Sequence, residues 1–153
     1  MSKPTEAHRR LEKLAGVWVG EENMAPSPWS PEGHTATGRS EVRVALDGLA
    51  AIADYRQERE GSVTFRGHGV YTYDPAEDQY LLHWFDCMSP GPEVFRGGFE
   101  DGVLTLTSHG PQGHARLTAD YSVEGRMANR MELSPDGESW TTVFDGRYDR
   151  RTG

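Results

Sequence analysis

Turn signals recur along almost the whole chain and constrain its fold more than any other feature of the sequence. After Gly16 the segments between turns alternate apolar and polar residues, which is the period of a half-buried strand. The turn signals are Asp47-Gly48, Glu60-Gly61, Asp74-Pro75, Pro90-Gly91-Pro92, Asp101-Gly102, Gly110-Pro111, Glu124-Gly125 and Ser134-Pro135-Asp136-Gly137. Their spacing of about twelve residues is typical of successive antiparallel hairpins. We therefore predict an all-β domain.

About ten strands are expected between these turns. Their predicted ranges are 17–23, 36–46, 49–58, 63–73, 79–88, 93–100, 103–109, 114–122, 126–133 and 139–149. Because nearly all connections are short, consecutive strands should pair as a meander, which closes most simply into an up-and-down antiparallel β-barrel without exposed edges. A barrel of eight strands can already hold a small ligand, so this architecture predicts an interior cavity.

One short helix is expected before the first strand. Thr5 is a suitable N-cap, and Ala7, Leu11 and Leu14 form one apolar stripe at helical spacing. Gly16 is a natural C-terminal stop. Because only one narrow face of this helix is apolar, we predict that it caps one end of the barrel.

Length and composition exclude several classes of protein. The chain has 153 residues, which fits a single domain over 1–153, and its one cysteine cannot form an internal disulfide. Its formal net charge of -8 argues against nucleic-acid binding. It lacks an apolar signal segment and any apolar run of about 18 residues, so we expect no membrane partner and a cytoplasmic location.

Hairpin geometry predicts which side chains face the barrel interior. A two-residue turn at Asp47-Gly48, followed by a three-residue loop over 60–62, places Tyr55 opposite Gly67. The next hairpin places Trp84 opposite Gly69, so that aromatic rings cover cross-strand glycines. The inner set further includes Val42, Val44, Leu46, Tyr71, Tyr73, Tyr80, Asp86, Met127, Asn129, Met131 and Trp140. A one-residue slip after Gly125 would instead turn Arg130 and Glu132 inward.

Five of these inner residues are candidate ligand-binding residues. Tyr55, Tyr71 and Trp84 offer aromatic contact area, while Asp86 and Asn129 can orient polar atoms of a ligand. The polar members of the inner set could equally satisfy one another through bound water.

A sixth candidate lies in the one long connection, from Met24 to Thr35. This segment contains three prolines and Trp29. A long ordered loop beside a cavity can act as a lid, and Trp29 would then contact the ligand. The alternative is that Trp29 packs on the rim of the barrel.

Two features invite catalytic or metal chemistry. If Asp86 is buried between Trp84 and Met88, desolvation should raise its pKa and suit it to acid–base work, but it could also simply accept structural hydrogen bonds. The histidines show no ligand spacing, although His109 and His114 flank a turn and could approach each other. We expect no metal and no cofactor.

Several segments resemble known barrels. The stretch Leu14–Gly20 resembles the G-x-W opening of lipocalin-like, or calycin, barrels. The chain also resembles a bacterial lipocalin-like family catalogued as a domain of unknown function, through Asp54-Tyr55, 67–74, His83–Asp86 and 134–140. The resemblance implies a barrel with a central cavity and no assigned activity. Related barrels bind fatty acids through interior arginines, or haem through an inward histidine, and our register places neither residue type inside.

The sequence is compatible with three functions. The leading hypothesis is a binder of a small, largely apolar or aromatic molecule. The alternative is a cofactor-free enzyme of the lyase or isomerase type, in which Asp86 acts beside Tyr55 and Tyr71. The third is an interaction module that forms a homodimer through the outer face of its sheet.

Overall fold

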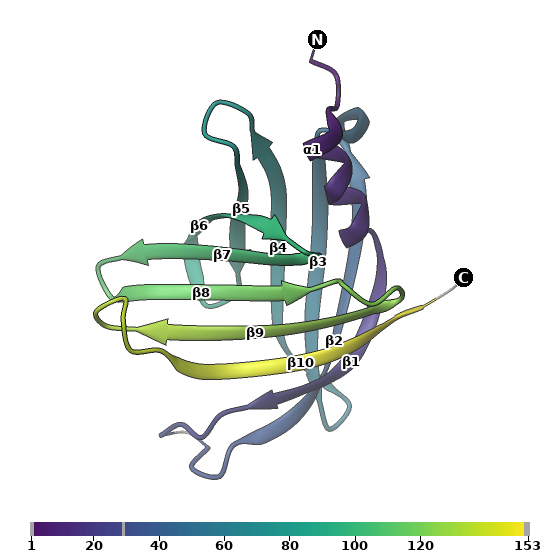
Figure 1. Ribbon diagram of the computed structural model, residues 1–153. Coiled ribbons are helices and arrows are strands. Elements are labelled where there is room, and N and C mark those ends of the chain that lie inside the picture. Colours follow the sequence, from purple (N-terminus) through teal and green to yellow (C-terminus); the bar gives the residue numbers. More distant parts are fainter. Residues whose placement is uncertain (1, 29, 152–153) are drawn as a thin grey trace.

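The computed structural model describes residues 2–28 and 30–151. Within them, ten strands pair in chain order, and β1 also pairs with β10, so the sheet closes into an antiparallel up-and-down barrel (Figure 1). The strands are β1 Gly16–Met24, β2 His34–Ala45, β3 Ala50–Arg59, β4 Ser62–Asp74, β5 Gln79–Asp86, β6 Ser89–Glu100, β7 Val103–Gly110, β8 Gly113–Asp120, β9 Arg126–Ser134 and β10 Thr141–Arg151. The predicted fold class is confirmed.

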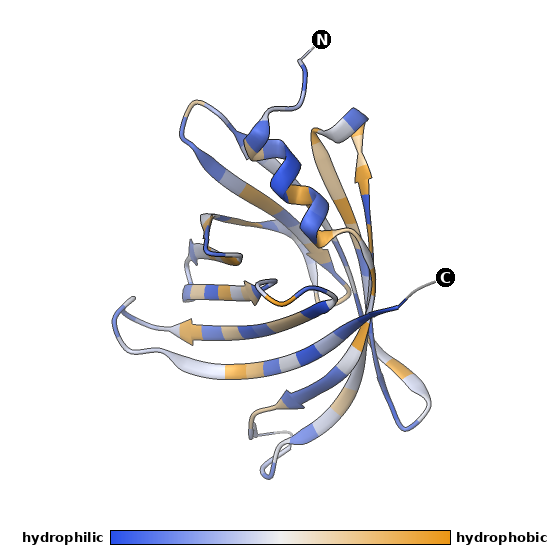
Figure 2. Ribbon diagram, turned by 45° about the vertical axis from the view of Figure 1, so that its right-hand side comes forward, coloured by the Kyte–Doolittle hydropathy of each residue, from blue (hydrophilic) through white to orange (hydrophobic). Residues whose placement is uncertain are grey.

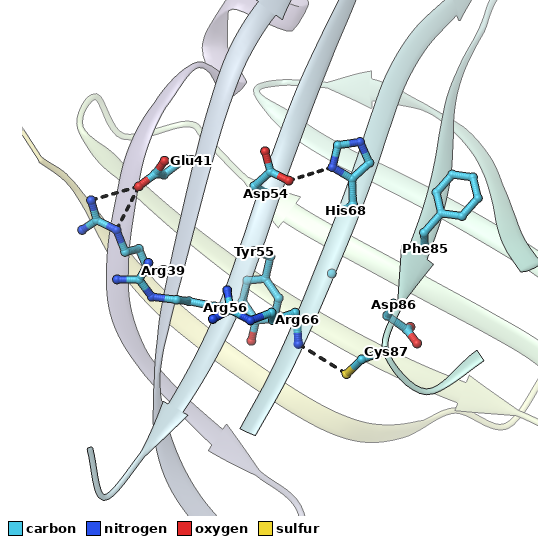
Figure 3. Close-up of a pocket in the computed structure, with 11 residues that line it drawn as sticks. Arg39, Glu41, Asp54, Tyr55, Arg56, Arg66, His68, Phe85, Asp86 and Cys87 are labelled. Carbon is cyan, nitrogen blue, oxygen red and sulfur yellow. Dashed lines mark hydrogen bonds and ion pairs between the residues drawn. The ribbon is translucent and has the colours of Figure 1, made fainter. Parts of the chain in front are cut away.

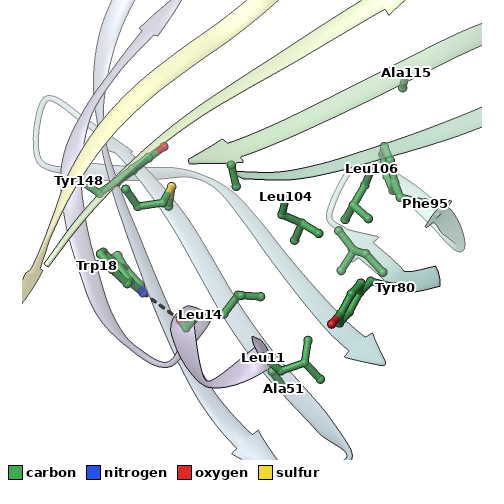
Figure 4. Close-up of a cluster of buried hydrophobic side chains, with 13 residues drawn as sticks. Leu11, Leu14, Trp18, Ala51, Tyr80, Phe95, Leu104, Leu106, Ala115 and Tyr148 are labelled. Carbon is green, nitrogen blue, oxygen red and sulfur yellow. Dashed lines mark hydrogen bonds between the residues drawn. The ribbon is translucent and has the colours of Figure 1, made fainter. Parts of the chain in front are cut away.

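Alternation of apolar and polar residues places one face of each strand in the interior. Figure 2 shows hydrophobic and hydrophilic residues interleaved along the strands, as expected when one face of a sheet is buried. The buried cluster gathers side chains from most of the barrel, including Phe95, Leu104 and Leu106 (Figure 4). No helix in the described parts of the chain has the length and hydrophobicity needed to cross a lipid bilayer.

The N-terminal helix covers one end of the barrel. It begins as α1 (Glu6–Arg9) and tightens into the 3-10 turn η1 (Arg10–Leu14). The backbone N–H of Thr5 donates to Nδ1 of His8 at 3.0 Å, which caps the first turn. Leu11 and Leu14 are completely buried, as their apolar stripe predicts.

Trp18 seals this closed end beneath the helix. Its Nε1 donates to the carbonyl oxygen of Leu14 at 2.9 Å (Figure 4). The guanidinium of Arg150, on β10, lies 4.6 Å from the centre of the Trp18 ring. It also donates to the carboxylate of Glu124 at 2.9 Å, which links β10 to the β8–β9 connection. Trp18 is therefore both a packed side chain and the link between helix and barrel.

The predicted register of β2 to β5 is largely correct. Tyr55 lies opposite Gly67, and Trp84 lies opposite Gly69. The loop at 60–62 was predicted wrongly: Glu60 and Gly61 form a two-residue turn with φ of 55° and 81°. The register still holds because a bulge between Gln57 and Glu58 in the β3–β4 ladder supplies the extra residue.

Two hairpin ends differ from the prediction. Leu46 was expected inside, but its φ of 53° turns the side chain outward, and it is 68% exposed. The β5–β6 turn falls at Cys87-Met88 instead of at the prolines, because the Asp86 carboxylate accepts a hydrogen bond from the backbone N–H of Met88 at 2.9 Å.

Trp140 was also expected inside and lies outside. The register shifts between Thr142 and Phe144, so Met131 pairs with Phe144 and Trp140 reaches the outer face. There the guanidinium of Arg116 lies 4.1 Å from the Trp140 ring. In β9 the side chains that face the interior are the predicted ones, namely Met127, Asn129 and Met131.

Candidate functional site

The barrel encloses a cavity of about 440 Å³. It lies between the helix-covered end and the opposite end, where the described residues of the β1–β2 connection (25–28 and 30–33) and the β3–β4 and β5–β6 turns are found. The apolar and aromatic part of its wall includes Leu82, Phe95, Leu117, Met127, Met131 and Phe144. The polar part includes Glu22, Ser40, Gln57, Asp86, Glu93 and Asn129. The interior thus combines an apolar surface with a few polar groups.

Five of the six residues predicted from the sequence line this cavity. They are Tyr55 on β3, Tyr71 on β4, Trp84 and Asp86 on β5, and Asn129 on β9. The sixth, Trp29, lies outside the described residues. The described part of its connection is tied to the barrel, because the backbone N–H of Ala25 donates to the carbonyl oxygen of Val143 at 2.9 Å.

A buried carboxylate, Glu22, forms the polar centre of the wall. It is 0% exposed and accepts hydrogen bonds from the hydroxyl of Tyr55 at 2.7 and 2.8 Å, from Nε2 of Gln57 at 3.0 Å and from the hydroxyl of Tyr148. A Cβ atom at Gly38 would overlap the carboxylate, so this glycine makes room for it. Three neutral donors therefore satisfy the two carboxylate oxygens.

Glu22 was not predicted as a site residue, although the sequence carries a signal for its position. Side chains alternate between the two faces of a strand, so Glu22 lies on the same face as Trp18, four residues earlier in β1. The neighbouring Glu21 has the opposite parity and is exposed. Placing the G-x-W tryptophan inside the barrel would have required Glu22 to be inside as well.

The tyrosine hydroxyls on this wall are held in the protonated form. Burial raises the pKa of Tyr71 to about 12. Burial is also the main cause of the raised pKa of Tyr55 and Tyr148, and the charge and hydrogen bonds of Glu22 raise both further. These hydroxyls therefore act as hydrogen-bond donors at neutral pH.

Alkaline titration tests this arrangement. A raised pKa in the folded state means that stability is fully present below the unfolded tyrosine pKa of about 10 and is lost as pH rises above it. We expect tyrosinate absorbance of the folded protein to appear well above pH 10, together with a loss of β-sheet circular dichroism. The same titration in concentrated urea serves as the control, and coincident curves would contradict buried hydroxyls.

Two acidic side chains lie at the open end. Asp86 accepts hydrogen bonds from Nε1 of Trp84 at 2.8 Å and from the backbone N–H of Met88 at 2.9 Å. Partial burial raises the pKa of Glu93, and the nearby charge of Asp86 raises it further. Asp86 thus acts as a structural acceptor, while Tyr55, its predicted catalytic partner, donates to Glu22 instead.

A second hollow, of about 390 Å³, lies on the outer face of β2 to β5 (Figure 3). Arg39, Arg56 and Arg66 stand opposite one another on adjacent strands along it. His68 points outward, with its Nδ1 2.7 Å from the carboxylate of Asp54 (Figure 3). Because this hollow is open to solvent and also carries several carboxylates, the interior cavity is the stronger candidate site.

The histidines of the β7–β8 hairpin approach each other, as the sequence allowed. The rings of His109 and His114 stack with centroids 4.1 Å apart. In residues 2–28 and 30–151, however, no group of three or more His, Cys, Asp or Glu side chains is arranged to hold a metal ion.

Comparison with known proteins identifies a family. The profile described as "Protein of unknown function (DUF1579)" matches residues 3–150, almost the whole chain. The chain belongs to this family. No curated protein matches the sequence of this DUF1579 member.

A solved structure shares the fold of this DUF1579 member. It is the crystal structure of Rv2717c from M. tuberculosis, which superposes with a TM-score of 0.72 at 10% sequence identity. The match covers 97% of this chain and 99% of that chain. At this low identity the similarity concerns the fold alone.

Proposed function

We propose that this protein binds a small, largely apolar or aromatic molecule in the barrel interior, as lipocalin-like barrels do. The observation that carries the proposal is the cavity of about 440 Å³ with its apolar and aromatic wall. Ligand pockets commonly measure about 300–1,000 Å³ and are lined in this way. Packed interiors hold few voids larger than a water molecule, so a space of this size favours an occupant.

The wall offers both contact area and orientation. Tyr55, Tyr71 and Trp84 come from three adjacent strands and would cover the faces of a ligand. Asp86 and Asn129 lie on opposite parts of the barrel and would orient polar atoms. The Asn129 amide is 3.3 Å from the Tyr148 hydroxyl, which connects it to the Glu22 network.

A cavity-filling variant tests the proposal. Ala119 on β8 lines the cavity and is 7% exposed, whereas Ala128 on β9 is exposed on the outside. We expect the wild type to bind one equivalent of the neutral fluorescent probe N-phenylnaphthylamine. Ala119→Phe should weaken this binding at least about tenfold, equivalent to about 1.4 kcal/mol, because the new ring occupies ligand space.

The matched control is Ala128→Phe, which adds the same ring outside the barrel and should leave the affinity unchanged. Thermal melting of both variants verifies that they are folded. Native mass spectrometry of gently purified wild-type protein would reveal a co-purified occupant. Equal binding by a folded Ala119→Phe variant and the wild type would place the probe outside the cavity and contradict the proposal.

A further inference from the structure

The charged side chains that line the cavity are all acidic. Glu22, Asp86 and Glu93 line it, and none of its described lining residues is lysine, arginine or histidine. In the parts of the chain that the structure describes, no ion pair connects these three carboxyl groups to a basic side chain. Electrostatic interactions are stronger in an apolar enclosure than in water. The cavity therefore disfavours an anionic ligand and favours a cationic one.

The three carboxyl groups differ in how far they are already satisfied. Glu22 is fully buried and accepts hydrogen bonds from three donors, so it acts as part of the wall. Asp86 and Glu93 lie at the open end. Each carboxylate oxygen of Asp86 accepts one hydrogen bond, whereas Glu93 is exposed to solvent and has Trp84 as its cross-strand partner. Burial raises the pKa of Glu93, and the nearby negative charge of Asp86 raises it further. A cation between them would relieve that repulsion.

Trp84 adds an aromatic surface at the same place. Cβ atoms at Gly67 and Gly69 would meet its ring, so one side of the indole lies flat on β4 while the residue also lines the cavity. The hydrogen bond from its Nε1 to Asp86 fixes the orientation of the ring. Tryptophan is the aromatic side chain that attracts cations most strongly.

We infer that the ligand is an amphiphilic amine, with an aromatic or aliphatic body in the cavity and a positively charged nitrogen between Asp86 and Glu93, beside Trp84. This inference rests on the proposed function and narrows it. Fatty acids and other anionic amphiphiles are disfavoured, because the described wall has no positive group to receive their carboxylate.

Three compounds that share a naphthyl group and differ in their head group test the preference for a cation separately from ligand binding itself. Naphthylethylamine, naphthylethanol and naphthylacetate differ chiefly in head-group charge, and each is titrated into the protein at neutral pH by calorimetry. We expect the amine to bind at least about tenfold more tightly than the alcohol, a difference of about 1.4 kcal/mol, and the acetate to bind most weakly.

Variants at the open end locate the cation. Glu93→Gln and Asp86→Asn should each reduce the ratio of amine affinity to alcohol affinity toward one. Because Asp86→Asn also alters the contact with Trp84, Glu93→Gln is the cleaner test. Glu100→Gln is the matched control: it removes the charge of a likewise exposed glutamate at the opposite end of β6, which does not line the cavity, and should keep the ratio.

Each outcome has a distinct meaning. Equal affinity for all three compounds, or tightest binding of the acetate, would overturn the cationic ligand and leave the proposed binding function standing. If Glu93→Gln and Asp86→Asn both keep the preference for the amine over the alcohol, the proposed position of the nitrogen between these two residues is wrong. Failure of all three compounds and of the neutral probe to bind, with no occupant in native mass spectrometry, would contradict the binding function itself.

Discussion

Trp18→Ala is expected to lower the free energy of unfolding by about 3–5 kcal/mol, the usual cost of removing a large buried aromatic side chain. Trp18 is 2% exposed, and its Nε1 is the donor that ties Leu14 of the helical segment to β1. Its loss also uncovers the guanidinium of Arg150. Urea denaturation followed by circular dichroism measures the change.

Trp140→Ala provides the matched control for this experiment. Trp140 lies on the outer face and contacts the Arg116 guanidinium, an interaction worth about 0.5–1 kcal/mol at such a site. We therefore expect a much smaller effect from the same truncation there. Equal destabilisation by the two variants would show that Trp18 does not seal the closed end.

The second large effect is expected at Glu22. Glu22→Ala leaves the hydroxyls of Tyr55 and Tyr148 and the amide of Gln57 without their acceptor. Each unsatisfied buried donor costs about 1–3 kcal/mol, and since water in the cavity can replace part of the network, we expect a total loss of about 3 kcal/mol. Glu21→Ala, at the adjacent exposed position, should change the stability by less than about 0.5 kcal/mol.

Glu22→Gln separates the charge from the shape of this side chain. The charge of Glu22 is one cause of the raised pKa of Tyr55 and Tyr148, after burial. Removing the charge should therefore shift the alkaline titration of the folded protein to lower pH. An unchanged titration curve would mean that burial alone keeps these hydroxyls protonated.

The residues that were predicted correctly depend on short-range rules. Tyr55 opposite Gly67 and Trp84 opposite Gly69 follow from turn residues and from the alternation of side chains along a strand. The pairing of Tyr55 with Gly67 was predicted correctly although the turn length was wrong, because the bulge in the β3–β4 ladder compensates for the shorter turn. The inward position of Asn129 follows from the same alternation within β9.

The errors arose where local backbone geometry overrides the apolar pattern. Leu46 is apolar, yet its positive φ directs the side chain to solvent. Trp140 is aromatic, yet the register shift in the β9–β10 ladder brings it to the outer face, where Arg116 covers its ring. Neither a bulge nor a left-handed non-glycine residue leaves a reliable mark in hydrophobic periodicity.

The sequence by itself determined the class of fold, the pairing of neighbouring strands and the aromatic character of the interior, because all three depend on residues close together in the chain. Only the tertiary structure decided the polar centre of the cavity. Tyr148 reaches Glu22 across 126 residues, a contact that exists because β10 closes the barrel against β1. The acidic character of the charged residues that line the cavity has the same origin. Glu22, Asp86 and Glu93 lie on three different strands and line one cavity only because the ten strands close into a barrel with a defined register.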